Sequence, residues 1–103
     1  MNIKAIQIDD RDNVATLTNN SKKGDIVQVL NPSGVVFLEL QLIEPIPYGH
    51  KISIKNLKVG DEIIKYGETI GIVNKNILKG SWIHTHNVGS ARMPTSGKEE
   101  GIL

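Results

Sequence analysis

The sequence contains no cysteine, no large excess of either charge and no long apolar run. Without cysteine there is neither a disulfide nor a thiolate ligand, so nitrogen or oxygen atoms would have to hold any metal. Twelve basic against eleven acidic residues give a formal net charge of +1, too little to hold a nucleic-acid backbone or an anionic membrane. No segment approaches the roughly twenty apolar residues of a membrane span, and the first residues lack an export signal. We therefore expect a soluble, cytoplasmic protein without a nucleic-acid or membrane partner.

The length of 103 residues suits one compact domain. Such a domain has little core in which to build both a deep substrate cavity and a complete catalytic apparatus. Residues 89–103 contain almost no apolar side chain before the last two, so burial within this domain cannot offset their ordering entropy. We predict a domain over residues 1–88 and a tail over residues 89–103 that is loose or orders against a partner.

Apolar residues recur with a period of two, most clearly at Val36, Leu38, Leu40 and Leu42. Turn residues at 31–34 separate this strand from another predicted over 25–30, which indicates a hairpin. Further strands are predicted over residues 3–8, 13–18, 51–54, 62–66, 69–73 and 82–87. Ten glycines, four prolines and the lack of a helical stripe allow at most single helical turns, near 56–59 and 75–79. The pattern predicts an all-β fold.

Three segments, residues 20–27, 56–63 and 76–83, share a weak repeat: Asn, three residues, Gly, Asp or Ser, any residue, then Ile or Val. Glycine allows the positive φ of a tight turn, and the following Asp or Ser can bond to nearby backbone amides. We interpret each copy as a turn that feeds a strand, and give the repeat little weight as a ligand site.

The segment 82–87 is the most informative for chemistry, because strand alternation places Trp82, His84 and His86 on one face. Residues two apart on a strand are separated by roughly 6.6 Å, so both imidazoles can lean onto one metal ion. Two ligands leave such a site incomplete, and packing of both rings against Trp82 is the alternative.

Three other places carry polar groups of interest. His50 lies in a stretch stiffened by two prolines, and matters for function only if it meets the other two histidines. Lys65, Tyr66 and Glu68 surround a glycine turn and suit binding of a sugar acid or proton transfer, although a plain exposed hairpin explains them nearly as well. The acidic residues at 9–12 match no calcium loop, which favours a turn leading into the strand at 13–18.

Four ordered motifs carry a resemblance to a known family: Asp-Asn-Val-Ala at 12–15, Ile-Pro-Tyr-Gly-His-Lys-Ile at 46–52, Lys-Tyr-Gly-Glu-Thr-Ile-Gly at 65–71 and His-Thr-His-Asn-Val at 84–88. Together they resemble the amino-terminal domain of the altronate and galactarate dehydratase family, over residues 9–88. The sequence departs from the family at Ser53, Thr69 and Thr85, where alanine, proline and valine are common. The resemblance implies an all-β SAF domain of the β-clip type.

The same domain type stands alone as the small subunit of altronate dehydratases and of sulfolactate sulfo-lyases, whereas fused members continue into a larger catalytic region. The resemblance therefore implies a hydro-lyase small subunit, a separate large catalytic subunit, a sugar acid such as altronate as substrate, and iron(II) or manganese(II). On this hypothesis the catalytic residues are His84, His86 and His50, the first two also as metal ligands, and the substrate-binding residues are Lys51, Lys65, Tyr66 and Asn87. The alternatives are a sulfo-lyase small subunit, a non-catalytic module for sugar-acid binding or assembly, and a structural domain with packed histidines. A homo-oligomer of the isolated chain stays open.

Overall fold

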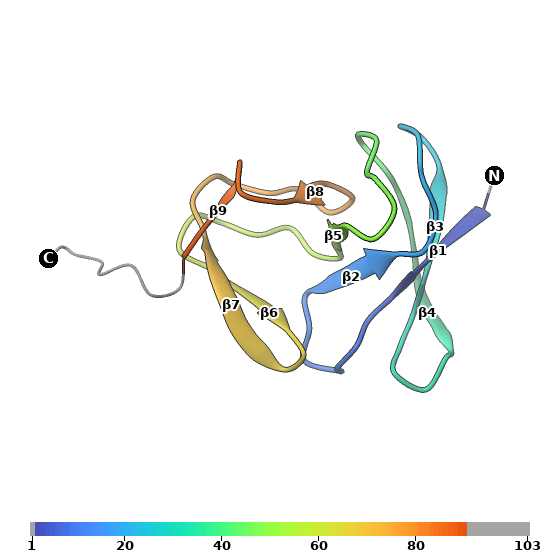
Figure 1. Ribbon diagram of the computed structural model, residues 1–103, viewed down its shortest axis with the longest axis horizontal. Helices are drawn as coiled ribbons and strands as arrows, with labels where there is room; N and C mark the ends of the chain where they lie inside the picture. The colour runs from blue at the N-terminus through green and yellow to red at the C-terminus, as the bar shows by residue number, and fades with distance from the viewer. Residues whose placement is uncertain (1, 91–103) are drawn as a thin grey trace, which may run out of the picture.

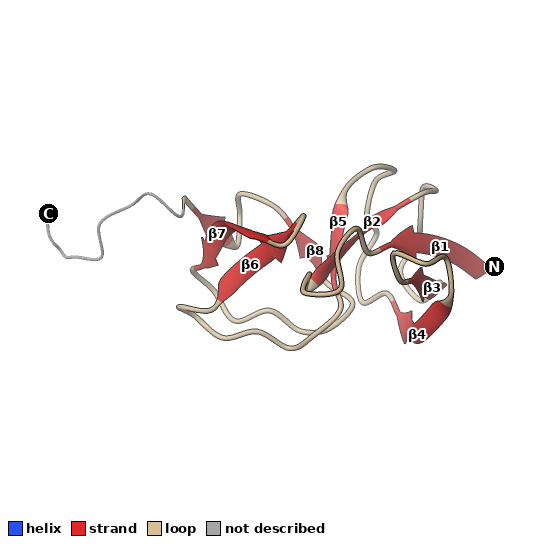
Figure 2. Cartoon of the chain, turned by 90° about the horizontal axis from the view of Figure 1, so that it is seen from below, coloured by secondary structure: helices blue, strands red, loops and turns tan. Residues whose placement is uncertain are grey.

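The computed structural model describes residues 2–90, which form nine strands and no helix (Figure 1). The strands are β1 (Asn2–Ile6), β2 (Val14–Leu17), β3 (Ile26–Leu30), β4 (Val36–Gln41), β5 (Lys51–Ser53), β6 (Glu62–Lys65), β7 (Glu68–Val73), β8 (Trp82–Ile83) and β9 (Val88–Gly89). Loops and turns connect them (Figure 2). The predicted all-β fold of the β-clip type is confirmed, and within these residues no helix could cross a membrane. The predicted tail lies outside the described residues from position 91 onward.

The strands form two sheets. The larger sheet has the order β4-β3-β1-β2-β5-β8, and only its β1–β3 pair is parallel. The smaller sheet has the order β6-β7-β9 and is antiparallel throughout. In Figure 1, β5 and β8 lie between the strands β1–β4 and the smaller sheet. The segment around β8 therefore sits at the middle of the molecule.

Each sheet has its own apolar core. Alternation along β3 buries Val27 and Val29, which pack with Leu40 and Leu42 beneath the larger sheet. The predicted hairpin of β3 and β4 is confirmed, although Val36, at the end of β4 next to the turn, stays exposed. The second core surrounds the smaller sheet and also contains residues from β2 and β8; its members are Val14, Leu57, Ile63, Val73, Ile77 and Ile83.

Two adjacent polar residues join β2 to the hairpin of β6 and β7. The carboxylate of Asp12 is 2% exposed and accepts bonds from the backbone N–H groups of Asp9, Tyr66 and Gly67 at 2.8 to 3.1 Å. The side chain of Asn13 donates to the carbonyl of Glu62 and accepts from the N–H of Ile64, at 2.8 and 2.9 Å. The predicted turn is confirmed, and these bonds make it a joint between the sheets.

The three repeated segments adopt the same turn. Gly24, Gly60 and Gly80 have φ angles of 92°, 95° and 92°, as the repeat predicts. The second and third copies also bond to each other. The side chain of Asn56 accepts from the N–H of Lys79 at 2.8 Å, and Asn76 accepts in turn from Val59 at 3.0 Å. The repeat is therefore architectural, as we interpreted it.

The single helical turns predicted near residues 56–59 and 75–79 are wrong. Leu57 and Ile77 instead form an antiparallel bridge with backbone hydrogen bonds of 2.8 and 2.9 Å. Both side chains are buried in the core of the smaller sheet. Pairing between segments twenty residues apart overrides the weak local preference for a helical turn, because it satisfies the backbone and buries apolar surface together.

Candidate functional site

The strand predicted over residues 82–87 ends at Ile83, because the chain turns at 84–87. The carbonyl of His84 accepts from the N–H groups of Asn87 and Val88, both at 3.1 Å. The side chain of Asn87, 7% exposed, accepts from the N–H of His84 at 3.0 Å and donates to the carbonyl of Trp82 at 2.8 Å. An asparagine that bonds to its own loop offers the backbone an alternative to a strand ladder. The prediction of a continuous strand is therefore wrong.

The turn nevertheless brings the predicted rings together. The ring of His84 stacks on Trp82 with centroids 5.4 Å apart and an interplanar angle of 21°. The ring of His86 meets Trp82 at 5.5 Å and lies 6.5 Å from that of His84. Both histidines are exposed, whereas Ile83 is buried. The expectation that Trp82, His84 and His86 share a side is confirmed, although a loop produces it in place of strand alternation.

His50 joins these residues from another part of the chain. Its N–H donates to the carbonyl of Pro47 at 3.1 Å, and its carbonyl accepts from the N–H of Leu17 at 3.0 Å. These bonds fix the loop, and the half-buried ring lies 5.3 Å from the rings of both Trp82 and His84. The indole N–H of Trp82 donates to Nδ1 of His50 at 3.3 Å. We call His50, Trp82, His84 and His86 the histidine–tryptophan cluster.

The cluster does not provide a metal site by itself. Within residues 2–90 no group of three or more His, Asp or Glu side chains is placed to hold a metal ion. The described residues therefore do not form a complete iron(II) or manganese(II) centre by themselves.

A cavity of about 490 Å³ opens beside His84; we call it the Lys51 pocket. The lining residues are Lys51, Ile63, Ile70, Ile83, His84, Thr85, Val88, Gly89 and Ser90. None of these carries a carboxylate. Burial lowers the pKa of the Lys51 ammonium, and the positive charge of Lys65 lowers it further. A carboxylate ligand would supply the counter-charge that Lys51 lacks, so the pocket suits an organic acid.

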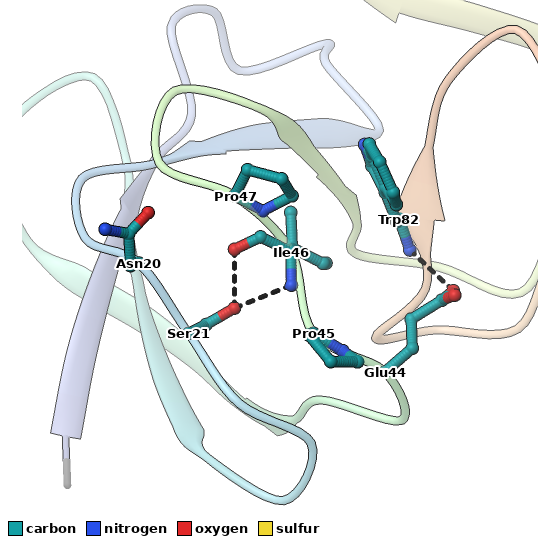
Figure 3. A pocket seen from close by; sticks show the side chains of 7 residues that line it. All are labelled: Asn20, Ser21, Glu44, Pro45, Ile46, Pro47 and Trp82. Carbon is teal, nitrogen blue, oxygen red and sulfur yellow. Dashed lines mark hydrogen bonds between the residues drawn. The ribbon is translucent and has the colours of Figure 1, made fainter.

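A second depression, of about 570 Å³, lies against Trp82 and contains Ser21, Glu44 and Pro47 in its wall (Figure 3). The carboxylate of Glu44 accepts from the backbone N–H of Trp82 at 3.0 Å, and the hydroxyl of Ser21 bonds to the backbone of Ile46. Because this wall carries a carboxylate and no lysine, it is less suited to an acidic ligand than the Lys51 pocket.

The other predicted substrate-binding residues lie away from the pocket wall. The ammonium of Lys65 lies 4.9 Å from the ring centroid of Tyr66, and it influences the Lys51 pocket through its charge. Tyr66 is exposed and has a φ of 57°, held by the bond from its N–H to Asp12. Both polar groups of the Asn87 side chain are used inside the loop. Substrate binding by Lys65, Tyr66 and Asn87 stays a prediction.

The sequence analysis did not identify the central position of Trp82 in the cluster or the contact between Trp82 and Glu44. Trp82, the only tryptophan of the chain, contacts all three histidine rings, and its proximity to His84 in the sequence was the available signal. The carboxylate of Glu44 accepts a hydrogen bond from the backbone N–H of Trp82. The two residues are 38 positions apart in the sequence, so no local pattern connects them.

Comparison with known proteins supplies independent information. The family described as Altronate/galactarate dehydratase SAF domain matches residues 3–91. The galactarate dehydratase (L-threo-forming) of Escherichia coli K12 is 41% identical over 76% of the chain, and the altronate dehydratase of Bacillus subtilis 168 is 33% identical over 80%. The chain spans only 14% and 15% of those two proteins. The (2R)-sulfolactate sulfo-lyase subunit alpha of Paracoccus pantotrophus is 47% identical over 46% of the chain and 70% of its own length.

Proposed function

This chain belongs to the altronate/galactarate dehydratase SAF domain family, and from this we propose that it is the small subunit of a two-subunit hydro-lyase. Its substrate would be a sugar acid such as altronate, and a separate large subunit would carry the rest of the catalytic apparatus. The observation that carries the proposal is the histidine–tryptophan cluster, with His84 and His86 exposed, beside a pocket lined by Lys51. Exposure of these two histidines supports a partner, because a reaction centre on one small domain's surface needs a second wall to exclude water.

The proposed reaction removes water across two neighbouring carbons. A base takes the proton from the carbon next to the carboxylate, and the hydroxyl of the following carbon leaves with a proton as water. The resulting enol becomes a 2-keto-3-deoxy acid by moving a proton from oxygen to carbon. Imidazoles suit both proton transfers near neutral pH, so His84 and His86 are the proposed acid and base, while Lys51 binds the substrate carboxylate.

The metal predicted from the resemblance enters no step of this proposal. Iron(II) or manganese(II) would stabilise the charge that develops when the proton leaves. The described residues of this chain hold no group of three suitable ligands. A metal in the assembled enzyme would therefore take most of its ligands from the large subunit.

The relatives of similar size support the two-subunit arrangement. Two (2R)-sulfolactate sulfo-lyase alpha subunits, from Paracoccus pantotrophus and Chromohalobacter salexigens, align over 70% and 58% of their own lengths. The same relatives also support a second candidate function, in which sulfite leaves from a sulfonated hydroxy acid. The third candidate is a non-catalytic module that binds a sugar acid or assists assembly.

The test uses the tagged chain purified from its native cells together with the large subunit that it binds. The complex is assayed with altronate, galactarate and sulfolactate, for keto-acid formation and for sulfite release. We expect keto acid from a sugar acid. The variant His84→Ala/His86→Ala should lose turnover by about 100-fold or more, because general acid–base groups contribute that much. Its thermal midpoint should stay close to that of the parent chain, because both side chains are exposed.

The matched control is Lys79→Ala, an exposed side chain in the turn before β8, which should keep full activity. Sulfite release from sulfolactate, without keto-acid formation from sugar acids, would mean that the chain is a sulfo-lyase subunit and not a dehydratase subunit. A double variant with unchanged kcat and a raised KM would support the binding module, because only uniform binding would have been removed.

A further inference from the structure

The bond between Trp82 and His50 restricts what His50 can do. An indole nitrogen carries a hydrogen and only donates, so the Nδ1 atom of His50 must accept. A neutral imidazole carries one proton, which then belongs to Nε2. The two rings meet edge to face, with an interplanar angle of 85°, so that the edge of one ring faces the other.

Trp82 is held firmly enough to impose this choice. Its backbone N–H donates to Glu44 at 3.0 Å, and its carbonyl accepts from the side chain of Asn87 at 2.8 Å. Its backbone also pairs with Ile52 of β5. The indole in addition stacks on His84. These contacts come from three different segments and hold Trp82 in place beside His50.

We propose that Trp82 is a positioning residue that fixes His50 in the Nε2–H tautomer, so that His50 acts as a hydrogen-bond donor and not as the base or a metal ligand. Within residues 2–90 the Nε2 atom has no hydrogen-bond partner, so its N–H is available to an oxygen of the substrate. Proton abstraction is then left to His84 and His86. The division of roles among the three histidines rests on the proposed function, whereas the tautomer of His50 does not.

The tautomer is tested on the chain alone, by nitrogen chemical shifts of its labelled histidines at a pH where His50 is neutral. In the parent chain Nδ1 of His50 should be unprotonated and Nε2 fully protonated. Trp82→Phe keeps an aromatic ring but removes the donor, and should give a mixture of both tautomers. The matched control, His84→Ala, removes a ring contact of His50 but leaves the indole, and should keep the single tautomer.

A proton on Nδ1 of His50 in the parent chain would overturn the proposal, as would an unchanged tautomer in a folded Trp82→Phe variant. Amide signals of β1–β4 report whether that variant is folded. If it is not, the parent chain decides the matter through nitrogen–nitrogen coupling between the indole of Trp82 and His50. A detected coupling supports the bond, and its absence overturns it.

Activity of the assembled enzyme tests the donor role separately. In His50→Gln the longer amide can bring an N–H to the place of Nε2, and kcat should stay within about tenfold of the parent value. The shorter amide of His50→Asn reaches only the place of Nδ1, and kcat should fall about 100-fold. Equal, large losses in both variants would mean that His50 transfers a proton or binds a metal. A failure of dehydration itself would leave the tautomer measurement unaffected.

Discussion

The positive charge of Lys51 is affected by the partial burial of its side chain. Its side chain lines the pocket beside His84 and is partly buried, and none of the described residues that line this pocket carries a negative charge. Burial lowers its pKa because the low-dielectric surroundings disfavour the charged form, and repulsion from Lys65 adds to the effect. An acidic ligand should bind while Lys51 is charged, and binding should weaken as the pH rises through its lowered pKa.

The order of these two causes can be tested by following the carbon next to the Lys51 ammonium through a pH titration by NMR. Lys51 should titrate below the ordinary lysine value of 10.5. Lys65→Gln should raise the pKa of Lys51 only partly toward that value, because burial is the larger cause. Titration of Lys51 at 10.5 or above in the parent chain, or full restoration in Lys65→Gln, would contradict this assignment.

The three copies of the repeated turn explain how short strands are placed without helices. Each copy uses glycine at a φ near 90°, but the surroundings of the glycines differ. A methyl group on Gly80 would collide with the backbone carbonyl oxygen of Gln41, whereas one on Gly60 would point into open space. Gly80 therefore lets the turn before β8 pack against the connection that follows β4. That packing sets the position of Trp82.

The two glycines make a matched pair for a stability measurement. Gly60→Ala should lower the free energy of unfolding by about 1 kcal/mol, because only the left-handed backbone is strained. Gly80→Ala should lower it by about 3 kcal/mol, because the collision with Gln41 adds an overpacking cost. Urea unfolding of both variants measures the difference. Equal losses would show that the close approach at Gly80 contributes nothing.

At the scale of the whole molecule, residues of the larger sheet complete the core of the smaller one. Val14 belongs to β2 of the larger sheet and Ile83 to β8, yet both are buried in the core of the smaller sheet. The side chains of Asp12 and Asn13 add hydrogen bonds from the larger sheet to the hairpin of β6 and β7. Loss of either sheet would expose apolar surface and buried polar groups of the other.

We therefore expect one cooperative unfolding transition. Trp82 fluorescence reports on the larger sheet, against whose core the indole packs, and methyl NMR signals of Ile63 and Val73 report on the smaller sheet. The midpoints in urea should coincide, as in two-state unfolding. An earlier midpoint for Ile63 and Val73 would mean that the smaller sheet unfolds independently.

Local patterns predicted which segments form strands better than they predicted where each strand begins and ends. Period-two alternation at Val36–Gln41 and the glycine turns indicated strands that the structure contains. The strand predicted beyond Ile83 does not form, because the side chain of Asn87 closes a turn. The predicted helical turns do not form, because Leu57 pairs with Ile77. Both errors have one cause: a bond to a particular partner outweighs a local preference that amounts to a fraction of a kcal/mol per residue.

The sequence by itself determined the all-β architecture, the repeated turn and the proximity of His84 to His86, because these follow from spacing over a few residues. Only the tertiary structure decided that His50, more than thirty residues earlier, meets Trp82 and His84, and that Lys51 lines the neighbouring pocket. Those contacts depend on the pairing of β5 with β8. Spacing along the chain carries no information about which strands become neighbours, since pairing is chosen by burial and hydrogen bonding over the whole domain.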